Sequence, residues 1–128
     1  MKTIEAIQAN DLGPAAGPFS TAVKANGLLF LSGQIGTDNV GILATSFEAE
    51  VHQVLKNIGI ILASQHLGYQ HLVSVTIYLK DMDNFGKLNE IYRSYFNDYY
   101  PSRTCIAVLA LPLKANVEIT ATALLKNG

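Results

Sequence analysis

The chain has 128 residues and a formal net charge of −1, a length that suits one domain with its own hydrophobic core, here residues 1–128. Hydrophobic residues make up 49% of the sequence and charged residues only 15%, so few polar side chains are available to cover the surface. We therefore expect part of the apolar surface to be a subunit interface. Without a run of Lys or Arg, the sequence lacks the basic surface that nucleic acid or an anionic membrane requires, which argues against both partners.

The single cysteine, Cys105, cannot form an internal disulfide. The N-terminal residues show neither a charged and then apolar signal region nor an apolar segment long enough to span a membrane. Proteins without disulfides and without such segments are typical of the reducing cytoplasm. The sequence therefore predicts a cytoplasmic protein.

An Asn26-Gly27 pair between two alternating apolar runs predicts a β-hairpin, with strands at residues 22–25 and 28–35. The second run ends in the polar and glycine-containing stretch around Ser32-Gly33. This stretch fits a β-bulge or a close backbone approach, and it fits equally a strand that simply ends in a turn. Both interpretations stay open at this point.

Two helices are predicted from apolar residues at helical spacing. The first begins at Thr45, which forms a capping box with Glu48, and ends at Gly68. The second begins at Asp83, and Asn89 interrupts its apolar stripe. A polar residue on that face either hydrogen-bonds at the edge of the helix or contacts a ligand.

Three more strands follow from period-two alternation and β-branched runs. They cover residues 72–80, a segment that begins at Arg103 after Pro101, and residues 117–125. In the last of these, Glu118 lies on the face opposite the apolar residues. The order of strands and helices predicts an α+β fold, a mixed sheet with two helices packed on one face.

Arg103 opens an otherwise apolar strand and shares its face with Cys105. A guanidinium keeps its charge and is costly to desolvate, so Arg103 must pair with an acid, reach water or meet an anionic ligand. Cys105 has no base assigned to it. A lone cysteine on a strand is more typical of a small core hydrophobe than of a nucleophile.

Glu118 is the acid of interest as a partner for Arg103. If the last two strands pair as an antiparallel hairpin, the two residues are offset by roughly 23 Å along the strands, beyond the reach of their side chains. A site that uses both must then be joined across a subunit boundary. The alternative is an Arg at the start of a strand and an unrelated Glu on a solvated face.

The sequence offers no metal site. Its histidines, at positions 52, 66 and 71, are irregularly spaced. The stretch from Asp81 resembles the start of a calcium loop, but Tyr92 stands at the twelfth position, where a bidentate acid is required. We therefore expect no bound metal.

Several short motifs occur in the order found in one protein family and span nearly the whole chain. They are Gly17-Pro18-Phe19-Ser20, Ser32-Gly33-Gln34-Ile35, Lys80-Asp81-Met82-Asp83-Asn84-Phe85 leading to Asn89, Pro101-Ser102-Arg103-Thr104-Cys105, and Val117-Glu118-Ile119. Together they make the chain resemble the RidA (YjgF) family of imine deaminases.

The resemblance implies a fold like that of chorismate mutase from Bacillus, assembled as a barrel-like homotrimer with sheets inside, helices outside and ligand clefts between subunits. The implied reaction is hydrolysis of reactive 2-imino or enamino acids to 2-keto acids and ammonia, without a cofactor. Carried over by position, Arg103 grips the substrate carboxylate, and Glu118 orients the attacking water or moves a proton. The substrate-binding positions implied by the resemblance are Phe19, Ser32, Gly33, Asn89 and Cys105.

Active members of the family usually carry Tyr at the position of Phe19, so one hydroxyl expected in the cleft is absent here. Thr104 and Leu109 also differ from the commoner residues. A different function for the same assembly is non-catalytic binding of a keto acid or similar small carboxylate. Ribonuclease activity, sometimes attributed to relatives, ranks lowest because the chain lacks a basic patch and a His pair for in-line cleavage. Chaperone-like action would depend on exposed apolar surface rather than on Arg103.

Overall fold

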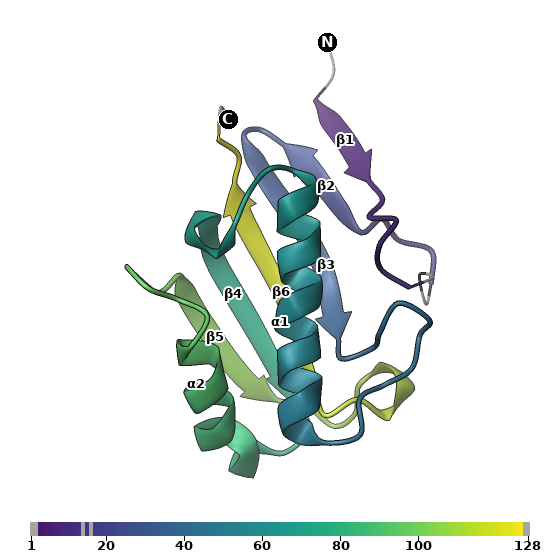
Figure 1. The fold of residues 1–128 in the computed structure, drawn as a ribbon, viewed down its shortest axis with the longest axis vertical. Helices are drawn as coiled ribbons and strands as arrows, with labels where there is room; N and C mark the ends of the chain where they lie inside the picture. Colours follow the sequence, from purple (N-terminus) through teal and green to yellow (C-terminus); the bar gives the residue numbers. More distant parts are fainter. Residues whose placement is uncertain (1–2, 14, 16, 127–128) are drawn as a thin grey trace.

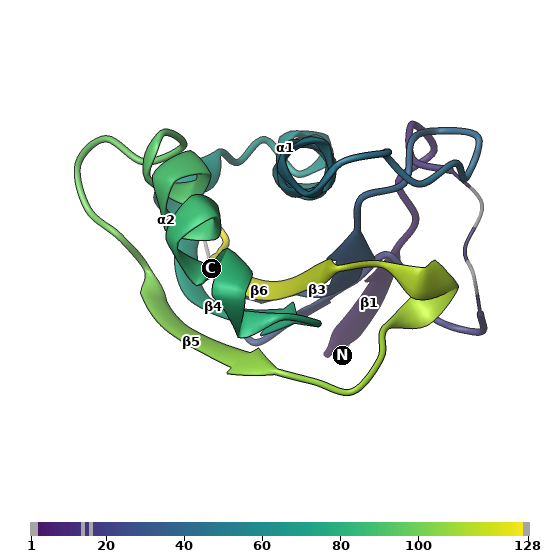
Figure 2. The ribbon, with the colours of Figure 1, turned by 90° about the horizontal axis from the view of Figure 1, so that it is seen from below.

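The computed structural model describes residues 3–13, 15 and 17–126. Six strands form one mixed sheet in the order β1-β2-β3-β6-β4-β5, in which β4 and β5 are parallel and the other neighbours are antiparallel. The strands are β1 (Ile4–Ile7), β2 (Ala22–Ala25), β3 (Leu28–Ile35), β4 (Leu72–Leu79), β5 (Ser102–Ala107) and β6 (Val117–Leu124). The helices α1 (Phe47–Ser64) and α2 (Phe85–Arg93) lie on the same face of the sheet (Figures 1 and 2). This architecture confirms the predicted α+β class.

The hairpin of β2 and β3 forms as predicted. Asn26 and Gly27 have φ angles of 53° and 81°, the left-handed conformation that a two-residue turn of this kind requires. Further along β3, the pairing with β6 shifts by one residue between Leu31 and Gln34. The Ser32-Gly33 stretch is therefore a β-bulge, and the simple strand end is excluded.

The core lies between the sheet and α1. The apolar face of α1 is almost completely buried, as its helical spacing predicted. The alternating residues Val117, Ile119 and Ala123 of β6 are likewise fully buried beneath it. In β4, the period-two alternation predicts Val73 on the same face as Val75, but Val73 is 45% exposed, because the pairing of β4 with β6 slips between Leu72 and Ser74.

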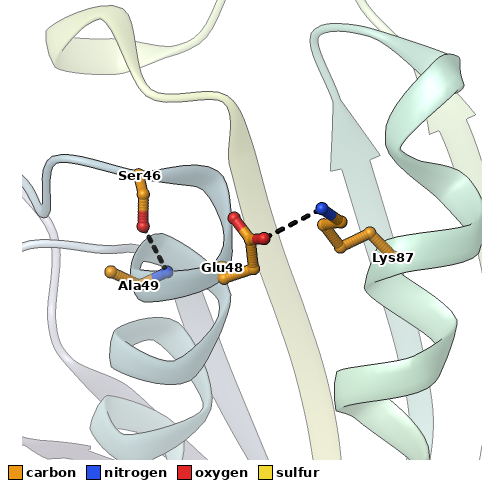
Figure 3. A network of polar contacts seen from close by, with 4 residues as sticks. All are labelled: Ser46, Glu48, Ala49 and Lys87. Carbon is orange, nitrogen blue, oxygen red and sulfur yellow. Dashed lines mark hydrogen bonds and ion pairs between the residues drawn. The ribbon is translucent and has the colours of Figure 1, made fainter.

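The first helix begins one residue later than predicted. Ser46, not Thr45, is the N-cap, and its hydroxyl accepts the Ala49 N–H at 3.1 Å. Glu48 does not close a capping box. It turns instead toward α2 and pairs with Lys87 at 2.9 Å (Figure 3). Thr45 and Ser46 are both suitable cap residues, and Ser46 takes the cap with an extended backbone, at φ −136° and ψ 159°.

The predicted stop at Gly68 is also wrong. The helix ends at Ser64, and His66 takes the left-handed conformation with φ 61°, a position that usually favours glycine. The second helix does not begin at Asp83 either. Asp81 accepts the Asp83 N–H at 2.9 Å and starts a short 3-10 turn that leads into α2 at Phe85.

The last two strands are not paired with each other. β4 lies between β5 and β6, so the antiparallel hairpin assumed for Arg103 and Glu118 does not exist. In the actual register, Arg103 is opposite Val75 and Val75 is opposite Ala121, three residues from Glu118. The two backbones are thus separated by about 10 Å along the strands and about 10 Å across them.

Candidate functional site

Glu118 lies on the sheet face that carries no helix. Its neighbours Val117 and Ile119 are buried under the helices, so strand alternation directs the Glu118 side chain to the opposite side. There it borders a cavity of about 330 Å³. The residues lining that cavity are Phe19, Ser32, Gly33, Ile35, Pro112 and Glu118.

The bulge in β3 builds one wall of this cavity. Bulging frees main-chain groups from the ladder, and Thr120 satisfies one of them by donating its hydroxyl to the Leu31 carbonyl at 2.9 Å. Ser32 donates its hydroxyl to the Ser20 carbonyl at 2.6 Å. That bond ties the bulge to the loop that carries Phe19, a side chain that is 48% exposed at the mouth of the cavity.

Gly33 is necessary for the position of the Glu118 carboxylate. A Cβ on residue 33 would overlap the carboxylate oxygen and would lie 3.0 Å from its Cδ carbon. Gly33 thus lets the acid lie directly against the main chain of the bulge.

Burial raises the pKa of Glu118 above its usual value of 4.5. Within the described residues, neither Glu118 nor Arg103 forms an ion pair. A carboxyl group with a raised pKa and no bound cation is well suited to accept and return a proton.

Arg103 lies on the helix side of the sheet, at the edge strand β5. Its Nη2 donates a hydrogen bond to Asn89 Oδ1 at 2.7 Å, and its guanidinium carbon is 4.9 Å from the centre of the Tyr92 ring. The Phe85 ring is at 5.5 Å. These contacts satisfy part of the guanidinium and leave its charge uncompensated, beside a second cavity of about 290 Å³.

Asn89 therefore has a polar partner on α2's inner side, which explains the interruption of the apolar stripe. Phe85 and Tyr92 flank it on that stripe, and the guanidinium lies over both of their rings, a contact that the sequence pattern did not reveal. Their spacing of three and four residues from Asn89 was the signal available. Ile35 and Pro112, on the wall of the Glu118 cavity, carried no such signal.

Cys105 follows Arg103 on the same face of β5 and packs against the hydrophobic core. Burial raises the pKa of its thiol, although the nearby Arg103 opposes this effect. A protonated, half-buried thiol is a poor nucleophile, which favours the core interpretation. Among the described residues, no three His, Cys, Asp or Glu side chains gather where they could hold a metal ion.

The predicted site residues therefore form two groups on opposite faces of the sheet. Phe19, Ser32, Gly33 and Glu118 share the first cavity, and Arg103 with Asn89 borders the second. Within one subunit the two groups do not meet.

No helix in the described ranges is long and apolar enough to cross a membrane.

Residues 10–125 match the family model described as Endoribonuclease L-PSP. The chain is 42% identical over 122 residues to Reactive Intermediate Deaminase A, chloroplastic, of Arabidopsis thaliana, an alignment that covers 93% of this chain and 65% of the plant protein. The chain belongs to the RidA/YjgF family. The mouse member named 2-iminobutanoate/2-iminopropanoate deaminase is 40% identical over 113 residues, with 86% of this chain and 84% of the mouse protein covered.

Solved structures of the RidA/YjgF family share this fold. The crystal structure of YEO7_yeast superimposes with a TM-score of 0.92 at 36% identity, covering 95% of this chain and 98% of the yeast chain. Names within the family point to different activities, since the family model is described as an endoribonuclease and the plant and mouse relatives are named as deaminases. The geometry and the charge of the site are therefore the basis for choosing between these two activities.

Proposed function

We propose that this RidA/YjgF protein hydrolyses reactive 2-imino acids and their enamine forms to 2-keto acids and ammonia. The observation that carries the proposal is the Glu118 carboxylate, which has a raised pKa and borders a cavity of about 330 Å³. The deaminase name of the mouse relative at 40% identity supports the same reaction. An endoribonuclease would need cationic groups along a phosphate backbone, and the chain's net charge of −1 does not favour that substrate.

The proposed assembly is a homotrimer with the active site between subunits. Arg103 and Glu118 lie on opposite faces of one sheet, so a substrate can touch both only if a second copy of the chain supplies one of them. The face without helices, visible in Figure 2, carries exposed apolar side chains that suit burial against another copy. The exposed apolar residues of this face are Ile4, Phe30, Ile106 and Leu124.

In the proposed mechanism, Arg103 binds the substrate carboxylate through its planar fork of N–H donors and thereby fixes the imine carbon. Glu118 of the neighbouring subunit takes a proton from water as the water oxygen adds to the C=N carbon. Glu118 returns this proton to the imine nitrogen, which gives the tetrahedral carbinolamine. Glu118 then takes the proton of the carbinolamine hydroxyl and passes it to the amine nitrogen as the C–N bond breaks, so that ammonia leaves and the keto C=O bond forms. An imine is already a good electrophile, so the step needs positioning and proton transfer rather than a cofactor.

The second candidate is a trimer that binds a keto acid at Arg103 without turning it over. Phe19 favours this candidate, because the cavity beside Glu118 lacks the hydroxyl that active relatives usually place there. Such a protein would bind 2-ketobutyrate and leave an imine unchanged.

A coupled assay distinguishes the two candidates. An amino-acid oxidase generates 2-iminobutyrate from 2-aminobutyrate, and semicarbazide traps the imine unless the protein converts it first to the keto acid. We expect wild type to divert the imine and Arg103→Ala to lose this activity while remaining a folded trimer by light scattering. A folded wild-type trimer that diverts nothing would favour the binding protein, and a clean monomer would contradict the shared cleft.

A further inference from the structure

Glu50 is a buried carboxylate that the proposed reaction does not use. It stands in the first turn of α1 and is only 2% exposed. Burying a carboxylate is costly unless hydrogen bonds compensate it. Here one residue supplies them, since the Asn116 main-chain N–H donates to one carboxylate oxygen at 2.8 Å and its side-chain amide donates to the other at 2.7 Å.

Asn116 immediately precedes β6 and lies two residues before Glu118. Its carbonyl accepts the main-chain N–H of Lys80, at the end of β4, at 3.1 Å. The chain reaches Asn116 from the turn Pro112–Lys114, in which Leu113 and Lys114 have left-handed φ angles of 55° and 60°. An irregular turn of this kind does not by itself fix the direction of the following strand. The bonds of Asn116 to Glu50 and Lys80 hold the start of β6, next to its pairing with β3 and β4.

Glu50 also touches the strand on the other side of Glu118. Gly36 directly follows β3, and a Cβ at that position would lie 2.7 Å from the Glu50 Cα atom. The end of β3 is therefore packed against the same turn of α1 that holds Asn116. Since β3 carries Gly33 and β6 carries Glu118, both strands that determine the place of the acid meet at Glu50.

We propose that Glu50 is a positioning residue for the reaction, which through Asn116 fixes the start of β6 and so holds the Glu118 carboxylate against Gly33. The inference rests on the proposed function, because a position for Glu118 matters to catalysis only if Glu118 acts on the substrate. A purely structural Glu50 would lower stability and leave the activity of the folded protein unchanged.

Two substitutions test this proposal by exchanging hydrogen-bond donors and acceptors between residues 50 and 116. Asn116→Asp keeps the size of the side chain and turns its donor amide into a carboxylate that faces the Glu50 carboxylate, and no rotation of the new acid supplies a donor in place of the lost one. Combining Glu50→Gln with Asn116→Asp restores both bonds, because the new amide donates to the new carboxylate and its oxygen still accepts the main-chain N–H. The combined variant has the same total charge as wild type. Glu48→Gln is the matched control, since Glu48 is on the same turn of α1 but points to the exposed Lys87 (Figure 3).

Two readouts are compared on folded proteins of equal oligomeric state: kcat and KM for 2-iminobutyrate, and the carboxyl carbon NMR signal of Glu118, assigned with Glu118→Gln. For Asn116→Asp we expect kcat to fall by about tenfold or more with KM within about twofold, together with a moved Glu118 signal. The combined variant should recover most of kcat and return the signal. Glu48→Gln should match wild type in both.

An unchanged Glu118 signal in Asn116→Asp overturns the inference, as does a kcat that the combined variant fails to recover while it folds normally. The NMR readout keeps the two proposals separate. If wild type does not hydrolyse imines, the proposed function fails, and the Glu118 signal alone still decides whether Glu50 places that carboxylate.

Discussion

Gly33→Ala is the most direct test of the Glu118 carboxylate. The added methyl would overlap the carboxylate oxygen and would lie 3.0 Å from Cδ and 3.3 Å from Cγ of Glu118. The atoms it meets belong to the end of a flexible side chain rather than to main chain. The acid therefore moves aside and the fold survives.

The size of the effect follows from this geometry. Displacing Glu118 from a favoured rotamer costs about 0.5–1.5 kcal/mol, so the unfolding free energy should fall by about that amount. A shift of about 1 Å in a catalytic group costs about a hundredfold in rate, so kcat/KM should fall by about that factor. The assay is the semicarbazide competition with 2-iminobutyrate, combined with urea unfolding at fixed protein concentration.

Gly86→Ala is the matched control. No atom lies within 4 Å of a Cβ placed on Gly86, which stands in the exposed part of α2. Alanine should stabilise that helix by about 0.8–1.0 kcal/mol and leave kcat/KM unchanged. The reasoning is refuted if Gly33→Ala keeps activity within about threefold of Gly86→Ala, because the carboxylate would then not act from its position in this structure.

Three further predictions concern single side chains. Because burial raises the pKa of Glu118 above 4.5, the folded state binds more protons than the unfolded state between the two pKa values, and stability falls as pH rises through that window. Glu118→Gln should therefore be more stable than wild type at neutral pH and lose this advantage below the usual pKa of 4.5, as followed by thermal unfolding against pH. Tyr92→Phe removes a buried hydroxyl that has no partner within the described residues, so urea unfolding should show a gain of about 1 kcal/mol, and a loss would mean that the hydroxyl is bonded. Phe19→Tyr should leave imine hydrolysis equal or higher, whereas a large loss would show that Phe19 packs against a different substrate.

Local patterns in the sequence were reliable where neighbours along the chain decide the structure. The Asn26-Gly27 turn and the alternation of β6 depend on backbone conformation and side-chain period. The Ser32-Gly33 stretch left a bulge and a strand end equally open, and only the pairing of β3 with β6 decided for the bulge. Helix ends were less predictable. Thr45 and Ser46 are equally good caps by residue type, and only the path of the preceding loop selects Ser46.

The residues of the candidate site could likewise be predicted only in part. The sequence marked Arg103, Asn89 and Glu118 as polar residues in apolar elements, and its family motifs supplied their roles. It did not reveal that Phe85 and Tyr92 hold the guanidinium, because that contact joins α2 to β5. Nor did the sequence indicate a role for Glu50, because an acid in the first turn of a helix is common. Its contact with Asn116 exists only in the folded structure.

By itself, the sequence determined the order of the elements from β2 to β6, the face on which most of their side chains lie, and the family. Only the tertiary structure decided that β4 lies between β5 and β6, which places one strand between Arg103 and Glu118 and leaves them on opposite faces of the sheet. The physical reason is that strand alternation is a property of each chain segment, whereas strand order depends on which distant segments bury the most apolar surface together.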